Sequence, residues 1–260
     1  MHYLVLSGDA SWEDVDGTLE HHAVFLRRWC QEQEVQTNEV QRSWGLLPAF
    51  LSIADGRPLD LLELGPSAGL NLLWDRFAYR YSTGRWGAGS FELHGDDRVP
   101  PPAELLSRDV TVARRRGVDL SPVDVTTEHG SRLLQAFVWA DQAPRLERLR
   151  RAIDVARADP PELIRGDYVE ALPGLLRDRR ADAQLVVFQT ASTMYLDRGG
   201  ADRLRSALHT AGREEPVVFV TTARAPDDKG FALEIERFPD GRARRVAVFD
   251  FHGEWLEWGR

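Results

Sequence analysis

The candidate catalytic and ligand-binding residues of this 260-residue chain are concentrated in one short stretch. Residues 63–69 read ELGPSAG, so a glutamate precedes two glycines that enclose a serine. Glycine turns of this kind present backbone N–H groups to a ligand, and a serine on such a turn can also act as a nucleophile. The stretch therefore indicates either ligand binding or nucleophilic catalysis.

The elements that must position this stretch can be read on both sides of it. Leu59–Leu64 is a short apolar run of the length expected for a buried strand. Beyond Ala68, apolar residues recur at helical spacing as far as Phe77. We therefore expect a strand, a tight glycine turn and a helix, whose amino terminus would favour an anion or a polar ligand.

The first interpretation of the turn is nucleotide-type binding. Glu63–Gly69 resembles the E-x-G-x-G-x-G loop of S-adenosylmethionine-dependent methyltransferases, with Ser67 in place of the middle glycine. That resemblance implies contact with the cofactor by Glu63, Gly65, Ser67, Ala68 and Gly69, with Asn71 as a polar neighbour in the first helical turn.

The second interpretation is a hydrolase, because Gly65–Gly69 is also a literal G-x-S-x-G. The elbow of α/β-hydrolases follows several strands and an oxyanion segment, whereas mostly helical sequence precedes Leu59 here. Asp197 with His209 or His252 could complete a triad with Ser67. A plain strand-to-helix connection is the third interpretation. A dinucleotide fingerprint is excluded, because Ser67 and Leu70 occupy positions that would need glycine.

Two aspartates follow later strands of the expected sheet. Asp119 lies in a segment that resembles the second-strand end of methyltransferases, where an acidic residue binds the ribose hydroxyls. A carboxylate can accept hydrogen bonds from both hydroxyls of a diol. The 50 residues between Gly69 and Asp119 exceed the usual spacing of about 20, which an inserted hairpin would explain. An ordinary turn aspartate remains the alternative. Asp167 is the matching candidate for the adenine amino group.

Other candidates carry less weight. Gln189, Ser192 and Tyr195 follow the expected strand at 183–189 and are weak candidates for catalysis, because QTAST lacks the Asn-Pro-Pro-Tyr pattern of many methyltransferases. Thr37 or Asn38 can cap a helix running to about residue 54, and this helix could fold back over a nucleotide site.

Composition limits the classes of function. The net charge of −8 argues against a general binder of nucleic acids or anionic membranes. No apolar run approaches membrane-spanning length, and the single cysteine, Cys30, allows no intramolecular disulfide. We therefore expect a cytoplasmic protein that acts on a small molecule. No spacing of metal ligands is recognisable, so we expect no metal. The sequence leaves the oligomeric state open.

The order of elements predicts the fold class. Helices come first, then alternating strands and helices, and finally a hairpin at 231–251. This order predicts a Rossmann-like, methyltransferase-type three-layer α/β sandwich, with a mostly parallel sheet and an antiparallel C-terminal hairpin. We expect residues 1–57 to form a helical segment packed on the core formed by residues 58–260. We also expect a β-hairpin inserted at about 78–108.

Longer stretches resemble an uncharacterised bacterial family, domain of unknown function 2332. The matching stretches are VQTNEVQR (35–42), LELGPSAGLNLLWDRF (62–77), GVDLSPVDV (117–125), VWADQAPRLERLRRA (138–152) and LVVFQTAS (185–192). The family carries no activity over to this chain, although its order of motifs resembles that of divergent methyltransferases. The expected function is an S-adenosylmethionine-dependent methyltransferase acting on a small molecule. The alternatives are a non-catalytic Rossmann-like binding or scaffold protein and a serine hydrolase using Ser67.

Overall fold

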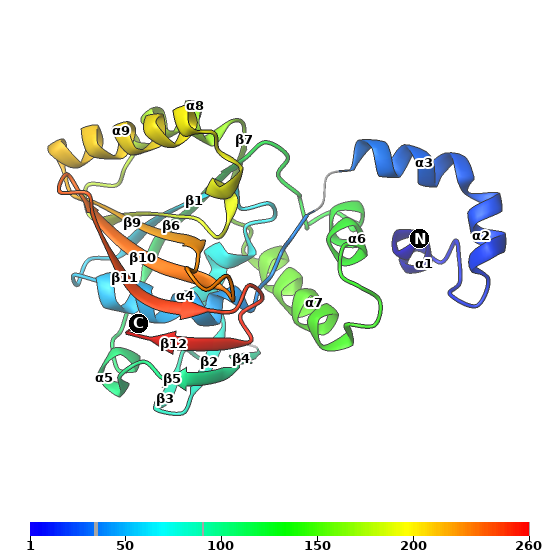
Figure 1. Ribbon diagram of the computed structural model, residues 1–260, viewed down its shortest axis with the longest axis horizontal. Coiled ribbons are helices and arrows are strands. Elements are labelled where there is room, and N and C mark those ends of the chain that lie inside the picture. The colour runs from blue at the N-terminus through cyan, green and yellow to red at the C-terminus, as the bar shows by residue number, and fades with distance from the viewer. Residues whose placement is uncertain (34–35, 90, 260) are drawn as a thin grey trace. The chain divides into compact units, whose positions relative to one another are not determined.

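The computed structural model describes residues 1–33, 36–89 and 91–259, which form two compact units (Figure 1). The helical unit comprises Met1–Asn38 and Val123–Pro160, and the sheet unit comprises Glu39–Pro122 and Pro161–Arg260. The chain therefore leaves the sheet unit after its second parallel strand and returns before the third. This division differs from a boundary at residue 57, because the helix at 42–53 belongs to the unit that holds the sheet.

The helical unit is built from five described helices. They are α1 (His2–Ser7), α2 (Val15–His21), α3 (Ala23–Glu32), α6 (Glu128–Ala136) and α7 (Ala143–Ala158). Tyr3 joins three of them, because its ring packs 4.5 Å from that of Trp29 and its hydroxyl bonds Nδ1 of His129 at 2.9 Å. Thr127 caps α6 by accepting the N–H of Gly130 at 3.0 Å, which satisfies one free donor of the first turn.

The sheet unit is organised around a nine-stranded sheet in the order β5-β12-β11-β10-β9-β8-β1-β6-β7. β1, β6, β7, β8 and β9 pair in parallel, whereas β10, β11 and β12 continue the sheet in antiparallel fashion. The bounds are β1 (Leu59–Leu64), β5 (Asp96–Val99), β6 (Val112–Asp119), β7 (Glu162–Arg165), β8 (Gln184–Phe188), β9 (Val217–Arg224), β10 (Phe231–Phe238), β11 (Arg242–Phe249) and β12 (Trp255–Trp258).

This topology confirms the coarse fold prediction. The five parallel strands follow the order 3-2-1-4-5 of a doubly wound sheet, and the chain closes with the antiparallel β10–β11 hairpin around Pro239 and Gly241. The strand predicted at Leu59–Leu64 is β1, and all six of its residues are buried. The structure is a mixed α/β fold with a large, mostly parallel sheet, compatible with three layers.

Alternate residues of the parallel strands face two different cores. Leu62 and Leu64 of β1 pack with helices α8 (Tyr168–Arg177) and α9 (Arg198–Glu214), which lie together over one face of the sheet (Figure 1). The other face packs on α4 (Arg42–Ile53), where Phe50 meets Phe188 of β8 edge-on at 5.2 Å. Glu63, between the two leucines, therefore points to the α4 face.

The predicted insertion is a small sheet with one hairpin. β2 (Ala78–Tyr81) pairs in antiparallel fashion with β3 (Gly84–Trp86) and in parallel with β4 (Glu92–His94). A short helix, α5 (Ala103–Leu106), follows, and β5 pairs with β12 of the large sheet. Trp44 of α4 connects the insertion to the large sheet's helix layer, because its Nε1 donates a hydrogen bond of 3.0 Å to the carbonyl of Arg80 in β2.

Two helices differ from their expected form. The helix predicted after the glycine turn is present as η1 (Leu70–Arg76), a seven-residue 3-10 helix interrupted at Leu73. Its residues 70–74 are all buried, so it packs on every side instead of along one stripe. Such a short segment lacks the dipole of a full helix, and the argument for an anion at its start fails. α4 begins at Arg42, so neither Thr37 nor Asn38 caps it.

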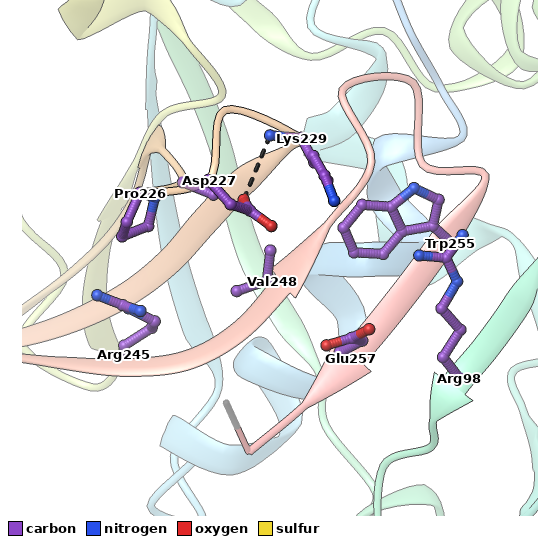
Figure 2. Close-up of a pocket in the computed structure, with 9 residues that line it drawn as sticks. Arg98, Pro226, Asp227, Lys229, Arg245, Val248, Trp255 and Glu257 are labelled. Carbon is purple, nitrogen blue, oxygen red and sulfur yellow. Dashed lines mark hydrogen bonds between the residues drawn. The ribbon is translucent and has the colours of Figure 1, made fainter.

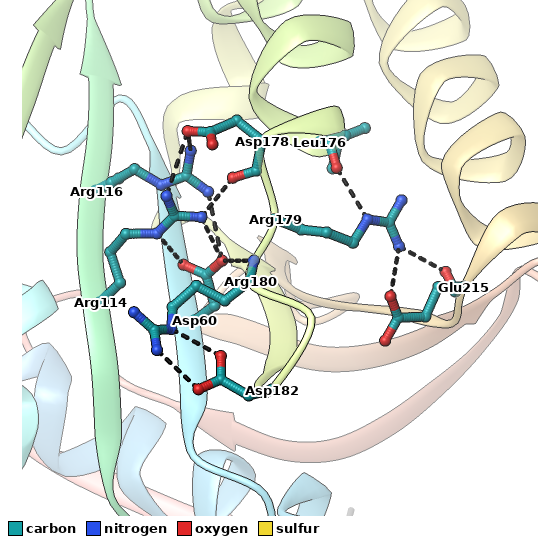
Figure 3. Close-up of polar contacts among 9 residues, drawn as sticks. All are labelled: Asp60, Arg114, Arg116, Leu176, Asp178, Arg179, Arg180, Asp182 and Glu215. Carbon is teal, nitrogen blue, oxygen red and sulfur yellow. Dashed lines mark hydrogen bonds and ion pairs between the residues drawn. The ribbon is translucent and has the colours of Figure 1, made fainter.

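A buried ionic cluster fixes the amino-terminal end of β1 (Figure 3). The carboxylate of Asp60 is fully buried and accepts Nε and Nη2 of Arg114 at 2.9 and 2.7 Å. The N–H of Arg180 adds a bond of 3.1 Å. Arg116, which is 1% exposed, lies 3.6 Å from the same carboxylate and donates at 3.0 Å to Asp178, the residue that ends α8. The cluster joins β1, β6 and α8.

Candidate functional site

The predicted ligand-binding segments lie together at the carboxyl ends of the parallel strands. Residues 65–69 follow β1, Asp119 ends β6, Asp167 follows β7, and Gln189 follows β8. These strands are neighbours in the order β7-β6-β1-β8 and run in the same direction. The chain moves outward from β1 to β7 and then returns to β8, so the boundary between β1 and β8 is a topological switch point. Ligands of open α/β sheets bind outside the strand ends at such a point.

The turn after β1 is held in an unusual backbone conformation. Gly65, Ser67 and Gly69 all have positive φ values, of 69°, 54° and 70°. A left-handed conformation costs a serine roughly 1–2 kcal/mol, whereas glycine adopts it freely. The N–H of Ser67 donates to Oδ2 of Asp119 at 2.8 Å, which compensates for that strain.

Asp119 joins the loops that follow β1 and β6. While Oδ2 accepts the N–H of Ser67, Oδ1 accepts the N–H of Ser121, also at 2.8 Å. A carboxylate has about four lone-pair positions, so each oxygen of Asp119 retains one for a further donor. The structure thus brings the predicted ribose residue against the predicted glycine turn. It also gives Asp119 a second role as an organiser of that turn.

Glu63 is a buried acid at the switch point. The residue is 2% exposed, and its Oε2 has no hydrogen-bond partner in the described part of the chain. Burial and the negative charge of Asp119, opposed by the positive charge of Arg42, together raise the pKa of the Glu63 carboxyl to about 8. At neutral pH the carboxyl therefore holds a proton and can donate one hydrogen bond as well as accept others.

Two buried polar residues of the α4 face complete this edge. Asn71 of η1 is 8% exposed, and its Oδ1 accepts the hydroxyl of Ser43 at 2.7 Å. Arg42 donates through Nε to the carbonyl of Phe251 at 2.9 Å and through Nη1 to that of Thr190 at 3.4 Å. Arg42 therefore joins α4, the end of β8 and the turn after β11 at one point.

The loop after β8 places its three candidate residues in different environments. Gln189 is fully buried and donates to Oγ1 of Thr221 and the carbonyl of Thr222, which is a structural arrangement. Ser192 donates to the carbonyl of Leu64 at 2.6 Å and packs where a side chain at Gly65 would lie. Tyr195, on the short helix η2 (Ser192–Tyr195), is 88% exposed.

The remaining candidates are spread more widely. Asp167 is exposed and caps α8, accepting the N–H of Val169 at 2.7 Å. Thr37 and Asn38 belong to the helical unit. Of the hydrolase partners considered, Asp197 caps α9 through the N–H of Gly200. His252 lies beside Glu39, with its Nδ1 3.5 Å from Oε2 of that residue.

A separate cavity of about 360 Å³ opens between β5, β11, β12 and the turn after β9 (Figure 2). Basic Arg98, Lys229 and Arg245 line it together with acidic Asp227 and aromatic Trp255. The guanidinium of Arg98 already stacks 4.3 Å from the Trp255 ring centre. None of the residues predicted from the sequence to bind a ligand lines this cavity.

Sequence reasoning did not anticipate the contacts around Arg42. Glu39, Arg42 and His252 come together although more than 200 residues separate the first two from the third. No local spacing could reveal such a pairing, because it depends on where the β11–β12 turn lies in the sheet.

Among the described residues, no helix has both the length and the apolar character required to cross a bilayer.

Comparison with known proteins agrees with the resemblance found in the sequence. A search of curated proteins gave no match. Residues 2–258, nearly the whole chain, match the family described as an uncharacterized protein conserved in bacteria (DUF2332). The chain belongs to this bacterial family.

Proposed function

We propose that the sheet unit binds S-adenosylmethionine at the carboxyl ends of β1 and β6 and methylates a small molecule. One observation carries the proposal. The glycine turn and Asp119 lie at the switch point of a doubly wound sheet together with Glu63, whose Oε2 has no hydrogen-bond partner among the described residues. This is where open α/β sheets bind nucleotides, and the sequence resembles a methyltransferase loop at the same place.

The residues present fit such a cofactor in their chemistry. Oε2 of Glu63 is a buried oxygen that no described residue bonds, and a buried polar group of this kind is costly unless something satisfies it. Asp119 retains lone pairs for the hydroxyls of a ribose. The glycines at 65 and 69 hold a backbone that a larger residue would strain. The N–H groups of Gly65, Ser67 and Gly69 already bond Val118, Asp119 and Pro66. Gly65, Ser67, Ala68 and Gly69 would therefore pack against the cofactor through their backbone, with Asn71 and Asp167 as polar partners.

Once bound, the cofactor would supply an electrophilic methyl group. The protein's own task is then to hold two reactants in line, and positioning alone can account for a large part of an enzymatic rate. Ser192 now covers Gly65, so ligand binding there requires the loop after β8 to move.

Calorimetric titration with S-adenosylhomocysteine tests the proposal. We expect micromolar binding, equivalent to about 8 kcal/mol, by native protein that has been freed of carried-over ligand. Asp119→Asn should weaken it at least about tenfold, because the amide keeps one acceptor but loses the charge that holds a diol. Asp109→Asn, an exposed change just before β6, is the matched control. Equal affinities for the two variants would contradict the assignment of Asp119.

One observation keeps serine hydrolysis as the second candidate. Ser67 has the positive φ of 54° that a sharp strand-to-helix turn gives a nucleophile. A 3-10 helix rather than an α-helix follows it, and Asp197 caps α9 instead of orienting a histidine. A fluorophosphonate probe distinguishes the two candidates, because hydrolysis predicts labelling that Ser67→Ala abolishes. Failure of both tests would leave the non-catalytic scaffold.

A further inference from the structure

A histidine and a buried carboxylate form a pair at the start of α4. Nδ1 of His252 lies 3.5 Å from Oε2 of Glu39. The side chain of Glu39 is 2% exposed, whereas that of His252 is 49% exposed. Because the two ring nitrogens lie on opposite sides of an imidazole, Nε2 points away from the carboxylate. The pair thus presents one nitrogen to a buried acid and the other to the accessible side.

The turn that carries His252 is firmly held. Asp250 accepts the N–H of His252 at 2.7 Å, and its carbonyl accepts the N–H of Gly253 at 2.9 Å. Gly253 has φ 78°, and a side chain there would collide with the carbonyl of Gln41 at the start of α4. Glu39 is fixed in turn, because its Oε1 accepts the N–H of Gln41 at 3.2 Å. Neither partner is on a loose surface loop.

Arg42 connects this pair to the candidate site. It lies three residues after Glu39, and its Nε donates to Phe251, the residue before His252. Its Nη1 reaches the carbonyl of Thr190 at the end of β8, and its charge acts on Glu63 at the end of β1. His252 therefore belongs to the carboxyl-end edge of the sheet, on the β8 side of the switch point.

We propose that His252 is the proton acceptor for the substrate at this site, with Glu39 as the residue that positions it. A neutral imidazole with its N–H at Nδ1, directed at Glu39, leaves a lone pair at Nε2. Nε2 takes a proton from an O–H or N–H group of the substrate, and the electron pair of that bond stays on the substrate atom. The resulting imidazolium lies beside the Glu39 carboxylate, which stabilises its charge.

This inference rests on the proposed function and specifies its substrate class. The methyl acceptor carries its nucleophile as an alcohol, a phenol or an N–H group, which must lose a proton during the reaction. A carboxylate acceptor has no such proton at neutral pH and would gain nothing from His252. A well-placed general base contributes typically 10²–10⁴-fold to the rate.

The tautomer of His252 in native protein tests the proposal without any substrate. Long-range 1H–15N spectra of histidine-labelled protein are recorded at about pH 8.5, well above the ordinary imidazole pKa of about 6.5. His252→Gln assigns the signals by removing them. We expect the Nδ1–H form at His252. The Nε2–H form in native protein would overturn the proposal, because Nε2 would then have no lone pair.

Glu39→Gln tests the positioning role with almost no change of shape. If the Oε1 position keeps its bond from Gln41, the new NH2 group faces Nδ1 of His252 and donates to it. The ring must then carry its proton at Nε2, so we expect the tautomer to invert. Glu254→Gln, an exposed change in the same turn, should leave the native form. An unchanged tautomer in folded Glu39→Gln would remove Glu39 from the proposal.

Cofactor binding separates this inference from the function on which it rests. Both Glu39→Gln and His252→Gln should bind S-adenosylhomocysteine within about twofold of native protein, because neither residue holds the cofactor. An Nδ1–H tautomer in a protein that binds no S-adenosylhomocysteine would refute the proposed function alone. Binding together with an Nε2–H tautomer would refute the role of His252 alone.

Discussion

At the level of single residues, the candidate site combines a strained turn with Glu63, a buried acid whose Oε2 bonds none of the residues that the structure describes. The sequence indicated the turn because glycine and serine types mark it, and Glu63 because an acid in a buried strand is unusual. It could not show that Asp119 and Ser67 bond one another, since 52 residues separate them. Nor could it indicate that the side chain of Gln189 donates hydrogen bonds to Thr221 and Thr222 of β9.

The raised pKa of Glu63 makes stability depend on pH. The pKa of the folded carboxyl is about 8 against 4.5 for an exposed glutamate, so the folded state binds more protons between these values. The contribution to the free energy of unfolding is full below pH 4.5 and is lost as the pH rises to about 8. Glu63→Gln should remove this slope, which reaches at most about 1.4 kcal/mol per pH unit.

Urea unfolding at several pH values between 5 and 8.5 measures this effect. As the pH rises, the free energy of unfolding of Glu63→Gln should increase relative to that of native protein. Glu104→Gln, an exposed change on α5, should keep the native slope. Parallel pH profiles for native protein and Glu63→Gln would contradict a protonated Glu63.

Ala191 provides a second test at this scale. It has φ 77° at the start of the loop after β8, a conformation that costs an alanine about 1 kcal/mol. Ala191→Gly should raise the free energy of unfolding by about 0.5 kcal/mol, after the added freedom of the unfolded chain is subtracted. Ala201→Gly within α9 should lower it by about 1 kcal/mol. A loss of stability from both changes would contradict the assigned strain.

At the level of secondary-structure elements, the two ends of β1 have different roles. The carboxyl end carries the candidate site, whereas Asp60 near the amino end holds β6 and α8 through arginines (Figure 3). Strands were predicted well where apolar runs were short and bounded by turn residues, as in Leu59–Leu64. Helices were predicted less well, because the packing of η1 and the N-cap role of Asp167 depend on neighbours that a local pattern does not contain.

Asp60→Asn tests how much the buried ionic cluster at the amino end of β1 contributes to stability. The amide removes the buried charge that Arg114 and Arg116 share and leaves them only the exposed carboxylate of Asp178, so we expect a loss of about 3 kcal/mol in the free energy of unfolding. Asp182→Asn breaks only an exposed pair with Arg180 and should leave the urea midpoint unchanged. Similar midpoints for the two variants would show that the buried cluster does not stabilise the fold.

At the scale of the whole molecule, the sheet unit contains every residue needed for the proposed chemistry. The glycine turn, Asp119, Glu63, Arg42 and His252 all lie within Glu39–Pro122 and Pro161–Arg260. The alternation of strands and helices was sufficient to predict the parallel sheet and its closing hairpin. Prolines stand at both boundaries of residues 123–160, at Pro122 and at Pro160–Pro161, but they indicate only local turns. They could not show that this segment packs with the amino-terminal helices.

Amide chemical shifts show whether S-adenosylhomocysteine binds at the switch point between β1 and β8, as we propose. On titration of labelled native protein, the account predicts the largest shifts at Gly65, Ser67 and Gly69, with the N–H of Lys229 at the separate cavity unmoved. Saturating addition that moves none of these three amides, or that moves only residues lining the cavity of Lys229 and Trp255, would contradict it.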